Sequence, residues 1–293
     1  MENKKRIVFI VNPISGIRKK QNVPDDIDHY LDKEKYDAQI LFTEYAGHAG
    51  PLARKAVADG ADIIVAVGGD GSINEVSKEL VYTKVTLGII PLGSGNGLAN
   101  FLNIPINVRK AIEILNNGNE MTIDTISVND DYFVSIAGVG FDALVAKHFA
   151  TQKRRGFMTY FRIVSNRYIN YRPKKYILNC NNETITRRAL FISFANSDQF
   201  GYNTSIAPDA KINDGLMDVC IVTKVPLLKI PYLTHMLFHK RVHESKYVEL
   251  IKTDEIFVSR KKNRVVNIDG ESKKLTKDLH FKMNHLSLKV IVP

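Results

Sequence analysis

Four short, largely apolar runs alternate with segments of helical periodicity in the first part of the chain. The runs are Ile7–Val11, Ala38–Phe42, Ile63–Val67 and Leu87–Ile90. The helical segments are Ala49–Asp59, Ile73–Leu80 and Val108–Asn116. Strands that are apolar along their whole length must be covered on both faces, as in a parallel sheet with helices on each side. This pattern predicts a doubly wound parallel α/β domain.

The pattern changes after Met121 to period-two alternation and short β runs, separated by turn residues. These runs are Met121–Val128, Tyr132–Ala137, Tyr176–Cys180, Leu190–Ala195, Met217–Val222, Val265–Ile268 and Leu286–Val292. Two helical stretches, Phe157–Tyr171 and Pro226–His239, interrupt them. We therefore expect a C-terminal antiparallel β-sandwich domain over residues 125–293, after an α/β domain over residues 1–124. The last strand is a candidate for return to the first domain.

Composition limits the class of protein. A length of 293 residues suits two domains, and an apolar fraction of 44% is ordinary for a globular core. No apolar stretch approaches the roughly 20 residues that span a bilayer. The apolar run after the basic Lys4-Lys5-Arg6 is too short for a signal peptide, so we expect a cytoplasmic protein. The net charge of +10 favours polyanionic partners.

Three polar, glycine-bearing loops follow three of the first-domain strands. They are Asn12-Pro13-Ile14-Ser15-Gly16, Gly68-Gly69-Asp70-Gly71-Ser72 and Pro91-Leu92-Gly93-Ser94-Gly95-Asn96-Gly97. Ligands of open parallel sheets bind at the carboxyl ends of the strands, so the loops should converge. One such loop is an ordinary βα turn, whereas three favour phosphate binding by backbone N–H groups. The sequence has no GxxxxGK[ST] pattern, and no GxGxxG follows the first strand, which disfavours P-loop NTPases and dinucleotide-dependent dehydrogenases.

Carboxylates lie in three loops where they could carry chemistry. Asp70 would repel a phosphate unless a cation such as Mg²⁺ lies between them. Asp269 and Glu271 flank Gly270, either as a solvated hairpin turn or as a general base that deprotonates a hydroxyl nucleophile. The acidic segment from Asp209 to Asp218 is either a plain turn or a cation site built on Asp214 and neighbouring carbonyl oxygens.

Positive charge is concentrated between Lys147 and Lys175, with nine basic residues and no acidic one. Aromatic and apolar residues at 4-3-4-3 spacing in this segment should share one helical face; they are Phe157, Phe161, Val164, Tyr168 and Tyr171. The pattern suits a helix that packs on its domain, or one that contacts an anionic membrane surface. No RRM, KH or zinc-finger pattern accompanies the charge, so we expect no nucleic-acid partner.

Taken together and in this order, these loops resemble the diacylglycerol kinase catalytic-domain family. That family includes bacterial lipid kinases, sphingosine kinases and ceramide kinases, and it is distantly similar to NAD kinases. The matching segments run across nearly the whole chain: Val11–Gly16, Gly68–Val76, Pro91–Ala99, Asn213–Asp218 and Asp269–Glu271. The resemblance implies an N-terminal α/β domain and a C-terminal β-rich domain with the active site between them.

The resemblance also implies roles for individual residues. ATP would be bound by Asn12, Pro13, Ile14, Ser15, Gly16, Thr43, Gly68, Gly69, Asp70, Gly71, Ser72, Ile73, Asn74, Glu75, Gly93, Ser94, Gly95 and Asn96. A structural Mg²⁺ would be bound by Asp214 and by the carbonyl groups of Lys211 and Leu216. The general base would be Glu271, with Asp269 beside it, or alternatively Asp70. Ser94 stands where many bacterial members have threonine, and a hydroxyl is kept.

These observations predict an ATP- and Mg²⁺-dependent lipid kinase that phosphorylates a lipid hydroxyl, with diacylglycerol as the expected acceptor. Its partner would be lipid at an anionic membrane surface, to which the chain binds peripherally. A homodimer is compatible with the sequence. The alternatives are a soluble-substrate kinase related to NAD kinases and a basic nucleic-acid-binding protein. The sequence does not identify the lipid, because acyl-chain pockets consist of ordinary apolar residues.

Overall fold

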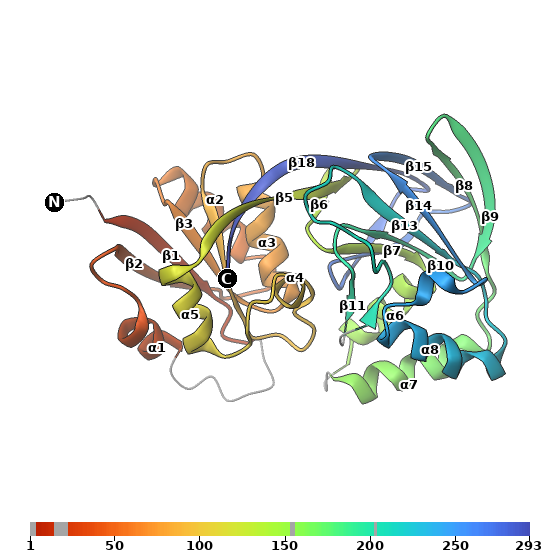
Figure 1. Cartoon of the computed structure of the whole chain (residues 1–293), viewed down its shortest axis with the longest axis horizontal. Helices are drawn as coiled ribbons and strands as arrows, with labels where there is room; N and C mark the ends of the chain where they lie inside the picture. The colour runs from red at the N-terminus through yellow and green to blue at the C-terminus, as the bar shows by residue number, and fades with distance from the viewer. Residues whose placement is uncertain (1–3, 15–22, 153–155, 202–203) are drawn as a thin grey trace. The chain divides into compact units, whose positions relative to one another are not determined.

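The computed structural model describes residues 4–14, 23–152, 156–201 and 204–293. Of the residues singled out above, Ser15, Gly16 and the basic Lys153, Arg154 and Arg155 lie outside these ranges. The chain divides into two compact units (Figure 1). The first consists of Met1–Ile123 and Leu286–Pro293, and the second of Asp124–His285.

The first unit is an α/β structure. Its elements are β1 (Lys5–Val11), α1 (Val23–Tyr30), β2 (Tyr36–Phe42), α2 (Ala49–Ala58), β3 (Ile63–Gly68), α3 (Asp70–Leu80), β4 (Thr86–Pro91), α4 (Gly97–Phe101), α5 (Val108–Asn117), the start of β5 (Asn119–Val128) and the end of β18 (Asp278–Val292). The strands lie in the order β2-β1-β3-β4 and are parallel. The end of β18 adds a further parallel strand beside β4, with Lys289 opposite Thr86.

Helices cover the sheet of the first unit, as the apolar strands require. Every residue of β3 and β4 is buried. Helices α2 and α3 pack together, as do α1 and α5 (Figure 1). The predicted helix from Ile73 in fact begins at Asp70, so the second glycine loop leads directly into α3. Helix α1 was not expected, because its sequence VPDDIDHY buries only Val23 and Ile27.

The second unit consists mainly of antiparallel strands. Its further elements are β6 (Asp131–Phe133), β7 (Ile136–Gly140), α6 (Phe141–Ala150), α7 (Phe157–Tyr168), β8 (Lys174–Cys180), β9 (Glu183–Ala189), β10 (Phe191–Ala195), β11 (Gln199–Gly201), β12 (Thr204–Ser205), β13 (Met217–Val222), η1 (Leu227–Lys229), α8 (Ile230–Phe238), η2 (Val242–Glu244), β14 (Val248–Thr253), β15 (Glu255–Arg260), β16 (Arg264–Ile268) and β17 (Glu271–Leu275). One sheet has the order β14-β13-β10-β7-β16-β17. The facing strands are β5, β6, β18, β15, β8 and β9.

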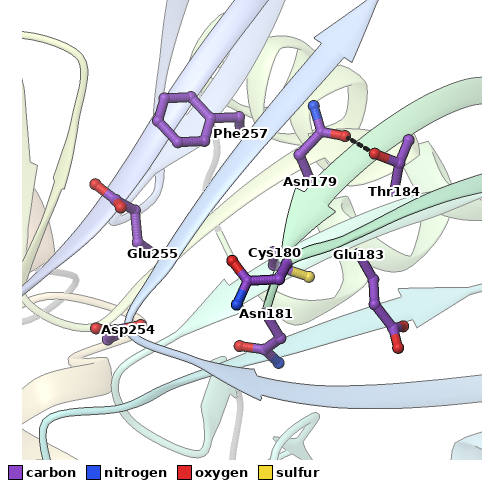
Figure 2. Close-up of a pocket in the computed structure, with 9 residues that line it drawn as sticks. Asn179, Cys180, Asn181, Glu183, Thr184, Asp254, Glu255 and Phe257 are labelled. Carbon is purple, nitrogen blue, oxygen red and sulfur yellow. Dashed lines mark hydrogen bonds between the residues drawn. The ribbon is translucent and has the colours of Figure 1, made fainter.

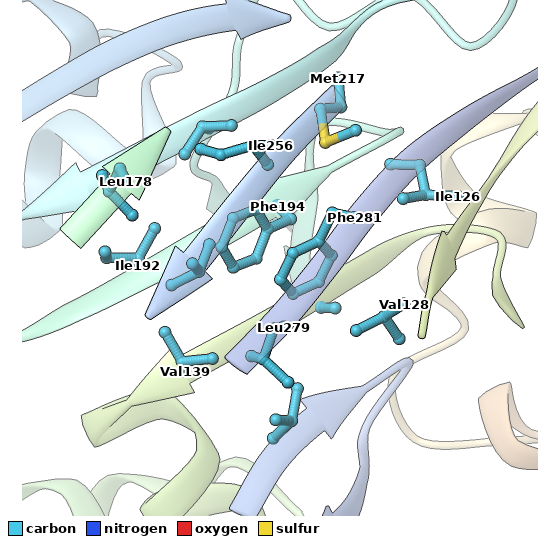
Figure 3. Packing of buried hydrophobic residues seen from close by; sticks show 14 of the residues in the cluster. Ile126, Val128, Val139, Leu178, Ile192, Phe194, Met217, Ile256, Leu279 and Phe281 are labelled. Carbon is cyan, nitrogen blue, oxygen red and sulfur yellow. The ribbon is translucent and has the colours of Figure 1, made fainter. Parts of the chain in front are cut away.

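A hydrophobic core lies between these two layers of strands (Figure 3). At its centre Phe194 of β10 stacks on Phe281 of β18, with ring centroids 3.7 Å apart. Ile192 and Val139 from one layer, and Leu279 from the other, pack around this pair. The predicted combination of a parallel α/β domain and an antiparallel β-sandwich is thereby confirmed.

Three local features differ from what the sequence predicted. The expected strand Tyr132–Ala137 is two strands, β6 and β7, with a break at Val134 and Ser135. Helix α6 was missed. In α7 the aromatic stripe does not lie wholly on the packed face: Ile163 and Tyr168 are buried, whereas Phe161 is 55% exposed. Val164, Tyr168 and Tyr171 of the predicted stripe do pack on the buried cluster, where Tyr160 and Ile163 join them.

No helix in the described ranges is both long enough and apolar enough to cross a membrane.

Candidate functional site

The described part of the first loop, residues 12–14, meets the second and third glycine loops at the carboxyl ends of β1, β3 and β4. The Asn12 side chain, which follows β1, donates a hydrogen bond through Nδ2 to Ser72 Oγ in the second loop at 3.2 Å. Its Oδ1 accepts from the backbone N–H of Ile14 at 2.9 Å. The backbone N–H of Leu92 in the third loop donates to the carbonyl oxygen of Gly68 at 2.7 Å. Parallel strand order thus brings together loops that are far apart in sequence.

The carboxylate of Asp70 fastens the third loop to the second. It accepts hydrogen bonds from the backbone N–H groups of Asn96 at 2.9 Å and Gly97 at 2.6 Å. Burial raises the pKa of Asp70, and these hydrogen bonds oppose that shift. The sequence predicted only that Asp70 faces a phosphate-bound cation. The two hydrogen bonds show that its carboxylate also positions the third loop.

Asn96 shapes the third loop from within. Its backbone is in the left-handed region, with φ of 54°. Its Oδ1 accepts from the N–H of Gly93, and its Nδ2 donates to the carbonyl oxygen of Gly93, both at 2.8 Å. A buried asparagine therefore closes the loop on itself, while Ser94 at its tip stays half-buried.

Glycine is required in these loops because their backbones approach each other closely. A Cβ atom on Gly93 would lie 2.6 Å from Gly69 Cα, and one on Gly95 would lie 2.7 Å from Asp70 Oδ2. Those distances are shorter than side-chain carbon atoms tolerate. The glycines at 93 and 95 are thus explained by loop–loop packing, and not by ligand approach alone, while a Cβ atom on Gly69 would make a tight contact of 3.2 Å with Gly93 Cα.

Glu75 connects the second loop to the segment after β2. Its carboxylate accepts from the backbone N–H groups of Gly47 and Ala49, each at 3.0 Å, at the start of α2. In the same segment the N–H of Thr43 donates to the carbonyl oxygen of Val11 at 2.9 Å. Thr43, Ser72 and Asn74 are buried, whereas Pro13 and Ile14 are exposed. Glu75 is therefore a positioning residue for the edge that carries the predicted nucleotide-binding residues.

This edge has the properties of an anion site. One end of the parallel sheet carries the glycine backbone of the loops, the hydroxyl groups of Ser72 and Ser94, and the N-terminus of α3. A helix N-terminus and closely packed glycine backbone favour phosphate groups. The residues present fit a nucleoside triphosphate.

In the second unit, Asp269 and Gly270 form the two-residue turn between β16 and β17. Their φ angles are 45° and 88°, and Ile268 pairs with Glu271 across the turn. Both central residues at positive φ define the type I′ geometry typical of tight hairpins. The hairpin interpretation of the Asp-Gly-Glu segment is thus confirmed at the level of the backbone.

The Asp269 side chain is engaged with the backbone of the segment between β6 and β7. It is buried, and it accepts from the N–H groups of Val134 at 2.9 Å, Ser135 at 3.0 Å and Ile136 at 2.9 Å. These bonds explain why the expected single strand is broken here: its N–H groups bind a carboxylate and not a neighbouring strand. Glu271, the first residue of β17, is half-buried. The two carboxylates of the turn therefore lie in different environments.

The predicted metal loop lies between β12 and β13. One Asp214 carboxylate oxygen accepts from the N–H of Leu216 at 3.1 Å, and the other lies 3.9 Å from the ammonium group of Lys252. That ammonium group is 3.0 Å from Asp218 Oδ2 and 3.3 Å from the carbonyl oxygen of Asp209. A carboxylate and carbonyl oxygens are the hard donors that Mg²⁺ prefers, so the predicted ligands fit the ion chemically. Lys252 already places one positive charge beside them.

Two residues outside the prediction hold this loop. Asp124 is fully buried; its Oδ2 accepts from the N–H of Gly215 at 2.7 Å, and its Oδ1 lies 2.9 Å from His285 Nδ1. Asp124 and Lys252 could have been noticed in the sequence, because each is a charged residue within a largely apolar strand. Among the described residues, no three His, Cys, Asp or Glu side chains gather as a metal-binding group.

A further buried carboxyl group, Asp142, lies in the first turn of α6. Burial raises its pKa to about 6, and a hydrogen bond from Asn267 Nδ2 at 2.8 Å opposes that shift. A side chain on Gly138 would collide with the Asp142 carboxylate. Asn267 Oδ1 is buried and has no hydrogen-bond partner. The pair is thus a polar contact that is only partly satisfied.

A pocket of about 500 Å³ opens between the β8–β9 hairpin and the start of β15 (Figure 2). Thr184 Oγ1 donates to Asn179 Oδ1 at its rim, at 2.8 Å. The pocket is lined by Asn179, Cys180, Asn181, Asn182, Glu183, Thr184, Asp254, Glu255 and Phe257. None of these residues belongs to the predicted site.

Two family models match consecutive parts of the chain. Residues 6–128 match the diacylglycerol kinase catalytic domain. Residues 135–291 match the YegS C-terminal NAD kinase beta sandwich-like domain. The two matches cover both units.

Similar proteins agree with these models. A diacylglycerol kinase of Bacillus subtilis is 27% identical over 272 residues, which are 91% of this chain and 90% of the relative. A diacylglycerol kinase of Staphylococcus saprophyticus is 26% identical over 275 residues, which are 92% of this chain and 89% of the relative. A solved Bacillus anthracis diacylglycerol kinase structure aligns with TM-score 0.77 at 18% identity, over 99% of this chain and 97% of its own; it shows likeness of fold. The chain therefore belongs to the diacylglycerol kinase catalytic-domain family and is a lipid kinase.

Proposed function

We propose that this chain transfers the γ-phosphoryl group of ATP to the free hydroxyl of diacylglycerol in a Mg²⁺-dependent reaction. The observation that carries the proposal is the meeting of three glycine loops at the carboxyl edge of a parallel sheet. The curated relatives named diacylglycerol kinase, which the chain matches over most of its length, support this lipid acceptor.

In this proposal the first unit binds the nucleotide. Backbone N–H groups of the glycine loops, with the hydroxyls of Ser72 and Ser94, would hold the phosphate groups, and Asn12 and Thr43 would complete the binding edge. Ile73, which the sequence also assigned to this site, is buried in the core and its N–H donates to the carbonyl oxygen of Gly69, so it would act only by packing. Mg²⁺, when bound, would offset the negative charge of the β- and γ-phosphates. Asp70 and Glu75 would act by fixing the loops, because both carboxylates accept backbone hydrogen bonds.

Glu271 is the general base in this proposal. It would take the proton from the lipid hydroxyl as that oxygen attacks the γ-phosphorus, while ADP leaves. Asp269 is less suited to this role because its buried carboxylate is already occupied by hydrogen bonds from three backbone N–H groups. Asp269 would instead hold the turn that presents Glu271.

The structural cation site remains part of the proposal. Asp214, with the carbonyl oxygens of Lys211 and Leu216, would hold one Mg²⁺ and thereby stiffen the loop between β12 and β13. Lys252 reduces the negative charge of this region, because its ammonium group lies between Asp214 and Asp218. We therefore expect weak binding of this ion, detectable at millimolar and not at micromolar Mg²⁺.

A soluble-substrate kinase is the second candidate, because the C-terminal match is to an NAD kinase beta sandwich-like domain. The test is transfer of radiolabel from γ-labelled ATP to a panel of diacylglycerol, monoacylglycerol, sphingosine, ceramide and phosphatidylglycerol, with NAD and sugars in parallel. Labelled phosphatidic acid as the main product supports the proposal. Labelling of NAD or a sugar with no labelled lipid would replace it with the alternative.

A further inference from the structure

Helices α7 and α8 and the short helix η1 expose large apolar side chains. Leu228 of η1 is 94% exposed, Met158 of α7 is 74% exposed, and Ile169, just after α7, is 63% exposed. Leu227, Phe161 and Tyr232 are also exposed. We call the exposed side chains of α7, η1, α8 and residues 169–175 the α7–α8 surface. Contiguous exposed apolar groups of this kind mark interaction sites.

The elements of this surface are fastened together. Tyr168 at the end of α7 accepts a hydrogen bond from the N–H of Val225 at 2.9 Å and donates to its carbonyl oxygen at 2.5 Å. Lys224 Nζ donates to the carbonyl oxygens of Ile169 and Tyr171 at 3.0 and 2.8 Å. Ile230 packs against the same buried cluster as Tyr168. Leu227 and Leu228 are therefore held beside the end of α7, and Figure 1 shows α7 and α8 next to each other.

The surface is positively charged. No aspartate or glutamate occurs from Ala143 to Asn182 or from Val219 to His243, which include α7, η1 and α8. Arg162, Arg167 and Lys229 form no ion pair within the described ranges. Burial lowers the pKa of His148, and the nearby charges of Arg167 and Lys147 lower it further. Two acids beside the end of α8 form ion pairs with the basic residues that follow it: Asp198 pairs with Lys240, and Glu244 pairs with Arg241.

The exposed apolar side chains and the positive charge together discriminate among three possible binding partners of this surface. A second copy of the chain in a symmetric dimer would place like charges opposite each other, which is unfavourable. Nucleic acid would engage the basic residues, but the three most exposed side chains of the surface, Leu228, Met158 and Ile169, are aliphatic and offer no stacking surface for bases. Exposed leucines surrounded by unpaired basic side chains match a bilayer, whose phosphate headgroups lie above an apolar layer.

We propose that the α7–α8 surface docks on an anionic lipid bilayer, with Leu227 and Leu228 entering the acyl region and Arg162, Arg167 and Lys229 contacting lipid phosphates. The inference extends the proposed function, since a kinase for diacylglycerol meets its substrate at a bilayer. It identifies η1 as the inserting element, which the basic segment alone did not reveal.

The chain contains no tryptophan, so a single introduced tryptophan reports its own environment. Leu228→Trp should show a blue shift of emission on addition of phosphatidylglycerol–phosphatidylcholine vesicles, and brominated lipids should quench it. The matched control is Ile106→Trp, at a 52% exposed position in the first unit. The control should show neither change. These measurements contain no ATP and no diacylglycerol, so they are independent of whether the proposed reaction occurs.

Affinity is tested with Leu228→Ser, which removes an apolar side chain without touching the core. Its vesicle partition coefficient should fall by about tenfold, because burying a leucine contributes at least the roughly 1.4 kcal/mol that corresponds to a factor of ten. Ile106→Ser should bind like the wild type. Arg162→Ser with Arg167→Ser should weaken binding at low salt and make it less dependent on salt. Circular dichroism should show all variants folded.

Three results would overturn the proposal. The first is a Leu228→Trp spectrum that vesicles leave unchanged while the protein itself co-sediments. The second is binding that is equal on phosphatidylcholine alone. The third is a dimer that Leu228→Ser dissociates, with vesicle binding unaffected. Activity on short-chain diacylglycerol should survive Leu228→Ser; absence of kinase activity in the wild type would instead count against the proposed function.

Discussion

Replacing Asp142 with asparagine should stabilise the protein above pH 6. The Asp142 carboxyl is buried at the start of α6 and receives one hydrogen bond, from Asn267 Nδ2. Asparagine keeps an acceptor for that bond and removes the buried charge. It also adds an N–H donor next to Asn267 Oδ1, which has no partner. An isosteric change thus removes one electrostatic cost and can satisfy an orphaned oxygen.

The magnitude follows from the pKa of Asp142, which burial raises from 3.8 to about 6. Between about pH 4 and pH 6 the folded protein binds this proton more tightly than the unfolded chain does. Stability of the wild type therefore falls as the pH rises through this window, and the loss is complete above pH 6. A difference of about two pKa units corresponds to about 3 kcal/mol, since each unit is worth about 1.4 kcal/mol.

The assay is urea unfolding of the wild type and Asp142→Asn at pH 5 and pH 8. The free energy of unfolding of Asp142→Asn, relative to the wild type, should increase between these pH values by about 1.4 kcal/mol, because about half of the full effect is already lost at pH 5. Asp130→Asn, at an exposed carboxylate, is the control and should show no such change. An equal pH dependence of Asp142→Asn and the wild type would refute the buried-charge argument.

Three further predictions concern the candidate site. Gly93→Ala should weaken Mg²⁺-ATP binding at least tenfold and lower the melting temperature, because its Cβ would lie 2.6 Å from Gly69 Cα; calorimetric titration that finds normal affinity would exclude the loop packing described here. Asp269→Ala should destabilise the protein by about 3 kcal/mol or more, since it leaves three backbone N–H groups unpaired, and a melting temperature like that of the wild type would contradict those hydrogen bonds. Lys252→Met should increase the melting-temperature rise that Mg²⁺ produces, because it removes a competing positive charge, and Asp214→Ala should abolish that rise; no Mg²⁺ effect in either variant would eliminate the cation site.

The sequence predicted those strands and helices that can be recognised from their own residues, without knowledge of their partners. Strands β3 and β4 are buried on both faces, so they appear as continuous apolar runs. Strand β13 begins and ends at the predicted residues, Met217 and Val222. Strands β9 and β17 were missed, because their exposed residues are charged and their pairing depends on β8 and β16.

The site was predicted at the level of loops but not of side-chain contacts. Glycine spacing and strand order suffice to bring the three loops together. The partners of Asp70 are 26 and 27 positions away, and those of Asp269 are more than 130 positions away. No local pattern reveals such partners, so both carboxylates resembled reactive groups in the sequence. The structure adds that both carboxylates accept hydrogen bonds from backbone N–H groups.

The assignment of Glu271 as general base tests the account most directly. The measurement is transfer of labelled phosphate from ATP to short-chain diacylglycerol by the wild type and Glu271→Gln, at ATP concentrations that saturate each protein. The account predicts that Glu271→Gln binds Mg²⁺-ATP normally and keeps the melting temperature of the wild type, while its kcat falls by about 10²–10⁴-fold. A Glu271→Gln protein that phosphorylates diacylglycerol at the rate of the wild type would contradict the account.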